Sequence, residues 1–127
     1  MTQTLEEALH HAIGQHFAWQ LHLKSSVESG QAPMPHDTAR AHDCCEFGQW
    51  LAQPEQIAQR GETVQYRVID RLHRAFHEAA GRVVEALENG RREEAHFLLE
   101  TEFEPQSQHL AAGLSKWLRE AHHGTAL

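Results

Sequence analysis

The chain has 127 residues, 40% of them apolar, which is enough for one domain with an apolar core but too few for two. Its formal charge of −7 and the lack of a dense Lys/Arg run argue against nucleic acid or an anionic membrane surface as the main partner. It has neither a signal-peptide pattern nor the roughly 18 to 20 consecutive apolar residues of a membrane span. We therefore expect one soluble, cytoplasmic domain over residues 1–127.

The first predicted helix runs from about Leu5 to about Glu28. Thr4 and Glu7 form a capping-box pattern at its start, and apolar residues then recur at helical spacing. The segment 29–35 holds one glycine and two prolines, which cannot continue a helix. This segment therefore ends the first helix.

The second predicted helix is shorter and begins near Asp37 or Thr38. It is expected to carry Cys45 and Trp50 and to end before Pro54. Looser structure follows as far as Gly61, with room for an extra short helix over 55–59.

The third and fourth predicted helices are long. Apolar residues at helical spacing indicate a helix over about 62–87, which the pair Asn89-Gly90 ends as a left-handed cap. The last helix starts near Arg91 or Arg92, and Pro105 is expected to kink or divide it. The tail over about 121–127 is expected to fray.

Each of these helices has one apolar side, and the sequence has no internal repeat or low-complexity segment. Helices of this kind bury their apolar sides most simply against one another. The sequence therefore predicts an all-α fold, an antiparallel four-helix bundle with a shorter second helix.

Four side chains are candidates for a metal site in such a bundle. His73 and His77 are four residues apart, so both imidazoles lie on the same side of their helix. His16 falls on the apolar side of the first helix, and Cys45 lies about one turn before Trp50. Three helices can thus bring three imidazoles and one thiol together, a tetrahedral Cys-His₃ set that suits Zn²⁺ better than iron or copper.

Each candidate also has a plainer interpretation. A single inward histidine is most often a hydrogen-bonded core residue, and a buried cysteine is usually a small apolar residue. Asp43, Glu46 and Glu78 can accept the second ring N–H of a ligating histidine, but surface carboxylates are the favoured interpretation. The remaining histidines are expected in solvent: His10, His11, His22, His36, His42, His96, His109, His122 and His123.

The only two cysteines, Cys44 and Cys45, are adjacent. A bridge between them would close a small strained ring and cannot staple the fold. A reducing compartment, and a thiol with some other use, fit this arrangement better.

Three segments of the chain resemble the chemoreceptor zinc-binding (CZB) domain of bacteria. They are His16-Phe17-Ala18-Trp19, Cys45-Glu46-Phe47-Gly48-Gln49-Trp50-Leu51 and His73-Arg74-Ala75-Phe76-His77. In that family a histidine stands three residues before a tryptophan, followed by a Cys-x-Phe/Leu-Gly-x-Trp core and a His-x-x-x-His pair. The order and the intervals of the three elements agree, and the resemblance spans essentially the whole chain.

The resemblance implies a helical bundle in which His16, Cys45, His73 and His77 bind one Zn²⁺. It also implies a regulatory domain of bacterial signalling, commonly a homodimer, attached to a chemoreceptor or a diguanylate cyclase and reporting zinc or oxidants such as hypochlorous acid. Which of these two is the signal stays open. Cys44 departs from the family pattern and is a candidate second thiol or substitute ligand.

Two other classes of function compete with this one. A hemerythrin-like di-iron bundle that binds oxygen would use the His-x-x-x-Glu of residues 42–46 and the His-x-x-x-His of residues 73–77. A di-iron pair needs further histidine and bridging carboxylate ligands, and the last helix has no Asp five residues after His109, since that position is Leu114. A structural interaction bundle with fortuitous histidines is the other alternative. We do not expect an enzyme, since four good ligands leave zinc no open position for water.

Overall fold

The structure is a computed structural model that describes residues 3–126, with side chains up to residue 123. Every regular element in this part of the chain is helical. In chain order the elements are α1 (Leu5–Ser29), α2 (His36–Arg40), α3 (Glu46–Leu51), α4 (Pro54–Arg60), α5 (Val64–Glu88), α6 (Arg92–Leu98), the π-helical turn η1 (Leu99–Phe103) and α7 (Glu104–Ala126). The predicted all-α helical bundle is confirmed.

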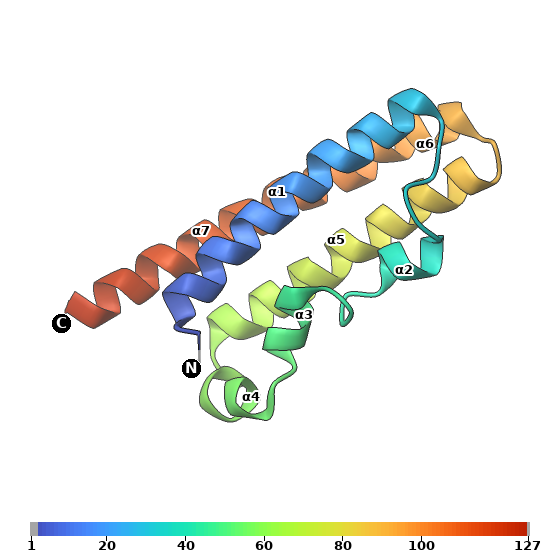
Figure 1. Cartoon of the computed structure of the whole chain (residues 1–127). Coiled ribbons are helices and arrows are strands. Elements are labelled where there is room, and N and C mark those ends of the chain that lie inside the picture. The colour runs from blue at the N-terminus through green and yellow to red at the C-terminus, as the bar shows by residue number, and fades with distance from the viewer. Residues whose placement is uncertain (1–2, 127) are drawn as a thin grey trace.

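The long helices lie along one another. Helix α7 packs against both α1 and α5 and runs in the opposite direction to them, so α1 begins and α7 ends at the same end of the bundle (Figure 1). The short helices α2, α3 and α4 lead back from the end of α1 to the start of α5 (Figure 1). They occupy the part of the chain in which the predicted bundle has its shorter second helix.

The prediction of a single second helix between residue 37 and Pro54 is wrong in one respect, because the structure has two helices here, α2 and α3. Residues 41–45 between them form a turn, and Cys45 has an extended backbone with φ −81° and ψ 157°. Its thiol accepts a hydrogen bond from the backbone N–H of Gly48 and so caps α3. Cys45 is therefore the N-cap residue of α3 and does not lie inside a helix. Its side chain points back toward the first N–H groups of α3, as capping side chains do. The extra short helix is present as α4.

The ends of the long helices follow the sequence signals. Thr4 and Glu7 form both hydrogen bonds of the capping box at the start of α1. Gly30, at the end of α1, has φ 77°. Asn89 caps α5 and Gly90 follows with φ 72°, so the predicted left-handed stop is confirmed.

Pro105 divides the last helix as predicted. Because proline has no backbone N–H, it cannot donate to the carbonyl one turn earlier. The chain passes from α6 through the π-helical turn η1 into α7, and Pro105 is the second residue of α7. Just before it, the N–H of Glu104 bonds to the carbonyl of Leu99, five residues back, so the hydrogen-bond register changes where proline lacks a donor.

The core is mostly apolar, and its buried polar residues are His16, Ser26, Gln56, His73, His77 and Ser107. Its largest fully buried apolar side chains are Phe76, Phe103, Leu9, Leu23, Ile69, Leu110 and Leu114. Two histidines, His73 and His77, are as deeply buried, with 0% and 1% of their surface exposed. Because histidine is seldom fully buried, this part of the core calls for a chemical explanation.

Among residues 3–126, no helix combines the length and the apolar character that crossing a membrane requires. Helix α7 continues to Ala126, while Leu127 lies outside the described residues. The single-domain extent and the fraying of the tail stay predictions.

Candidate metal centre

The four predicted ligand residues meet at one point in the bundle. His16 comes from α1, Cys45 from the cap of α3, and His73 and His77 from neighbouring turns of α5. Each offers one donor atom, and these four atoms all lie within 4.8 Å of one another. Donors around a tetrahedral zinc ion are about 3.3–3.6 Å apart, given Zn–N and Zn–S bonds of about 2.0 and 2.3 Å. The four side chains therefore need only a small closure to hold one metal ion.

Backbone carbonyls fix the orientation of two of the imidazoles. Nδ1 of His16 lies 2.7 Å from the carbonyl oxygen of Ala12, and Nδ1 of His77 lies 2.9 Å from that of Ala39. A carbonyl can only accept, so each Nδ1 carries the proton and donates it. The Nε2 atom of each ring therefore presents a lone pair, and both Nε2 atoms are buried without a hydrogen-bond partner. Such orphaned buried acceptors are costly, and a metal ion satisfies them.

His73 completes the group from the same helix as His77. Its Nε2 atom lies 3.2 Å from the sulfur of Cys45, and its Nδ1 atom is buried without a hydrogen-bond partner. Its ring also meets the rings of His16 and His77 edge-on, with centroids 5.0 and 4.6 Å apart. Three imidazoles in mutual contact are tolerated in a core only when they are neutral.

The electrostatics keep these imidazoles neutral. Burial lowers the pKa of His16 to about 4. Burial also lowers the pKa of His73, to about 2, and the neighbouring imidazoles of His77 and His16 add to this effect. Burial also lowers the pKa of His77. All three rings are therefore unprotonated at neutral pH, the form that binds a metal ion.

Two opposing effects act on the thiol of Cys45. Burial is the larger effect and raises its pKa, while hydrogen bonds from backbone N–H groups, above all that of Gly48 at 3.3 Å, offset part of this rise. The thiol also points at the carbonyl oxygen of His42, 3.6 Å away. A cation beside this sulfur would favour its thiolate form, which the N–H of Gly48 already supports.

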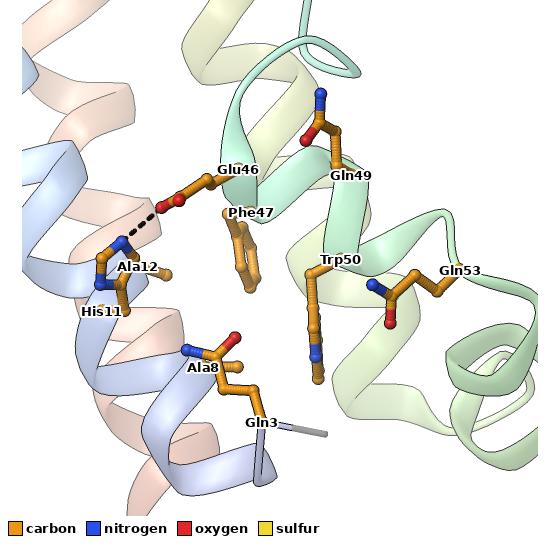
Figure 2. Close-up of a pocket in the computed structure, with 9 residues that line it drawn as sticks. All are labelled: Gln3, Ala8, His11, Ala12, Glu46, Phe47, Gln49, Trp50 and Gln53. Carbon is orange, nitrogen blue, oxygen red and sulfur yellow. Dashed lines mark hydrogen bonds and ion pairs between the residues drawn. The ribbon is translucent and has the colours of Figure 1, made fainter. Parts of the chain in front are cut away.

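The aromatic residues of α3 hold Cys45 in place. Phe47 stacks on Trp50 with centroids 5.8 Å apart and meets the ring of His73 edge-on at 5.2 Å. Trp50 in turn contacts Trp117 of α7 at 6.3 Å. Figure 2 shows Phe47 and Trp50 side by side on α3, at a surface cavity of about 260 Å³ between α3 and α1. Phe47 and Trp50 thus form a clamp that ties α3 both to the bundle and to one of the ligand residues.

We expect Trp50→Ala to weaken metal binding although it removes no ligand. A buried tryptophan changed to alanine costs about 3–5 kcal/mol of stability, and the freed α3 would no longer fix the Cys45 sulfur. Zinc affinity should fall by about tenfold or more, as it does when residues that orient metal ligands are lost. A competition titration measures this, with Trp50→Phe as the control that keeps a ring on Phe47. Unchanged zinc affinity in Trp50→Ala would refute the clamp.

The carboxylates near the site in sequence have other partners. Glu46 pairs with His11 of α1 at 2.5 Å and accepts from Gln15 at 3.0 Å (Figure 2 shows the pair with His11). Glu78 lies within 4 Å of arginine side chains of α2 and α5, and Asp43 is exposed. These are surface carboxylates, the interpretation that the sequence favoured.

Sequence reasoning missed the acceptors that orient His16 and His77. Ala12 stands one turn before His16, so the spacing alone allowed that contact. Ala39 lies 38 residues before His77, and no local signal points to it. Of the nine histidines expected in solvent, His36 and His42 are half-buried and the others are exposed. His109, which the di-iron alternative needs, is thus on the surface.

The comparison with known families fits this geometry. The family model of the chemoreceptor zinc-binding domain matches residues 16–84, more than half of the chain. The chain belongs to the chemoreceptor zinc-binding domain family. All four clustered residues lie inside the matched range. No curated protein and no solved structure matches the chain.

Chemoreceptor zinc-binding domains bind zinc and act in chemoreceptors and other signalling proteins. In this chemoreceptor zinc-binding domain the matched range ends at Val84, within α5. Helices α6 and α7 lie beyond it, yet α7 packs on both α1 and α5 and supplies Trp117 to the clamp. The helices outside the match therefore help to hold the site together.

Proposed function

We propose that this domain binds one Zn²⁺ through His16, Cys45, His73 and His77 and serves as a regulatory sensor in bacterial signalling. The observation that carries the proposal is the pair of buried Nε2 atoms on His16 and His77. Both are turned into the cluster by a backbone hydrogen bond on the other side of the ring, and neither has a partner there. This is how proteins orient metal-binding histidines.

The donor chemistry supports zinc as the metal. Three neutral imidazoles and one sulfur, with no carboxylate among them, form a closed tetrahedral set of the kind used in structural zinc sites. A closed set leaves no position for a reactive water, so we propose binding and regulation rather than catalysis. When bound, zinc would stabilise the thiolate form of Cys45.

The first test is the metal content of the protein purified without added metal. We expect about one zinc per chain by elemental analysis, since the cluster holds four ligands for one ion. His109→Ala is the matched control, because that histidine is exposed and outside the cluster. Iron near two per chain would instead support the oxygen-binding alternative, and protein that takes up no metal would refute the proposal.

The proposed signal is either a fall in free zinc or an oxidant such as hypochlorous acid. Cys45 is half-buried rather than fully enclosed in the core. The thiolate sulfur would take the chlorine of hypochlorous acid and release hydroxide, and hydrolysis of the S–Cl bond would then release chloride and form a sulfenic acid. The site would then contain three neutral imidazoles and no anionic ligand, so it would bind Zn²⁺ less tightly.

Loss of the Cys45 contact would free α3 to move against α1 and α5, and this movement is the proposed output. The domain would work in the cytoplasm as a homodimer, attached to a chemoreceptor or a diguanylate cyclase. Phe17 and Leu21 support α1 as the contact face, because they lie one turn apart and 59% and 55% of their surfaces are exposed. Sedimentation analysis of the domain tests the dimer, and a monomer at all concentrations would exclude it.

We expect removal of zinc to change the position of α3 more than the helix content. The apolar core of α1, α5 and α7 extends well beyond the four ligands and is large enough to fold without metal. Far-ultraviolet circular dichroism after chelation should therefore remain strongly helical, while tryptophan fluorescence changes because Trp50 lies on α3. A largely unfolded chain after chelation would contradict this expectation.

A further inference from the structure

Cys44 is the one thiol near the cluster that the proposed site does not use. It is exposed, whereas its neighbour Cys45 is half-buried and turned to His73. Both residues belong to the turn between α2 and α3, outside any helix. The two residues are adjacent in the chain, so the peptide between them keeps their Cα atoms about 3.8 Å apart.

We propose that Cys44 is a resolving thiol that forms a disulfide with Cys45 after an oxidant has attacked Cys45. This inference rests on the proposed function, since it takes the oxidised Cys45 as its starting point. The Cys44 thiol would attack the sulfur of the Cys45 sulfenic acid, forming the S–S bond and releasing water. Over both steps, two thiols and one hypochlorous acid give one disulfide, one chloride, one proton and one water.

The position of the pair suits a reversible bond rather than a structural one. Adjacent Cα atoms are about 3.8 Å apart across a trans peptide, less than the about 4.4–6.8 Å of an unstrained disulfide. A strained disulfide has a higher reduction potential and is readily reduced by cellular thiols. Without a second thiol, a sulfenic acid proceeds to the sulfinic acid, which thiols do not reverse. Cys44 would therefore protect Cys45 and let the site reset.

The disulfide would also change the structure of the turn that contains Cys44 and Cys45. The Cys45 sulfur caps α3 by accepting from the N–H of Gly48, and the N–H of Cys44 bonds to the carbonyl of Ala41 within the turn. Joining the two sulfurs requires this turn to rearrange, because the Cys45 sulfur must leave His73 and the cap. The first turn of α3 would then lose the thiol that caps it. Oxidation would thus release α3 rather than only remove a ligand.

The test treats zinc-loaded protein with one equivalent of hypochlorous acid and blocks the remaining thiols with N-ethylmaleimide. Trypsin cleaves after Arg40 and Arg60 and leaves both cysteines on the peptide 41–60. In the wild type this peptide should be unlabelled and lighter by two hydrogen atoms. Cys44→Ser, which changes only an exposed side chain, should keep its zinc before oxidation and show a Cys45 sulfenic acid that dimedone traps.

Recovery gives the second readout. After excess oxidant and then dithiothreitol, at least about threefold more of the wild type than of Cys44→Ser should regain zinc, because only the variant goes on to the sulfinic acid. Equal sulfinic acid on Cys45 in both proteins, or a disulfide between chains in place of the internal one, would overturn the inference. Zinc that is bound and released on oxidation without any disulfide would also overturn it, and would leave the proposed function standing. A disulfide in a protein that never binds zinc would uphold the pairing and refute the zinc sensor.

Discussion

Cys45→Ser should lower the zinc affinity by more than about 100-fold. Partners that merely orient metal ligands are worth about 10- to 100-fold in affinity, and this change removes a ligand itself. It removes the only anionic donor, since His16, His73 and His77 are held neutral by burial. A serine hydroxyl is too weak an acid to replace the thiolate at neutral pH. Competition with a chromogenic chelator measures the affinity.

The neighbouring cysteine provides the control for this experiment. Cys44→Ser makes the same chemical change one residue away, at an exposed side chain outside the cluster. Its zinc affinity should stay within about twofold of the wild type, because no ligand and no residue that orients one is altered. If Cys44→Ser loses zinc and Cys45→Ser keeps it, the ligand assignment is wrong.

Gly48→Ala should destabilise the protein and disrupt the site together. A Cβ atom at this position would overlap the carbonyl oxygen of His42 and lie 2.8 Å from its carbonyl carbon. Both are backbone atoms of the turn that leads to Cys45, so they cannot move aside as a flexible side chain can. Overpacking of this kind costs about 1–3 kcal/mol. The central value of this range is about 2 kcal/mol. For a chain of this length, such a loss of stability should lower the Tm by about 6–10 °C.

The shifted turn would also carry the Cys45 sulfur away from the imidazoles, so zinc affinity should fall with the Tm. Gly14→Ala is the matched control, since a Cβ there meets nothing within 4 Å on the exposed side of α1. That variant should gain about 0.5–1 kcal/mol, because alanine favours a helix over glycine. Thermal unfolding measures the Tm of both variants, and a zinc titration measures their zinc affinity. Equal Tm changes in the two variants would show that the contact with His42 is unimportant.

Local patterns of the sequence were sufficient for the long helices. The capping box at Thr4, the left-handed stop at Gly90 and the division near Pro105 all depend on a few neighbouring residues. Such signals are strong because caps and breakers act through the backbone within one turn. The interval from His73 to His77 likewise follows from the helical period.

The expected second helix shows where local signals fail. The apolar spacing of Phe47, Trp50 and Leu51 fits a helix, but it does not reveal that the helix begins only after Cys45. That boundary depends on the thiol acting as a cap and on the fit of Gly48 against the turn at His42. Both are contacts of the folded turn, and a thiol is an uncommon cap, so helix propensity did not predict the division.

The sequence by itself determined the helical class, the chemical identity of the four donors and the spacing of two of them. Their meeting point was decided by the tertiary structure, because it requires α1, α3 and α5 to pack together. The free Nε2 atom of His77 is likewise a tertiary result, since the carbonyl that occupies its Nδ1 belongs to Ala39, 38 residues away. The physical reason is that residue type and helical period are local properties. Burial and hydrogen bonding between distant segments arise only when the chain has folded.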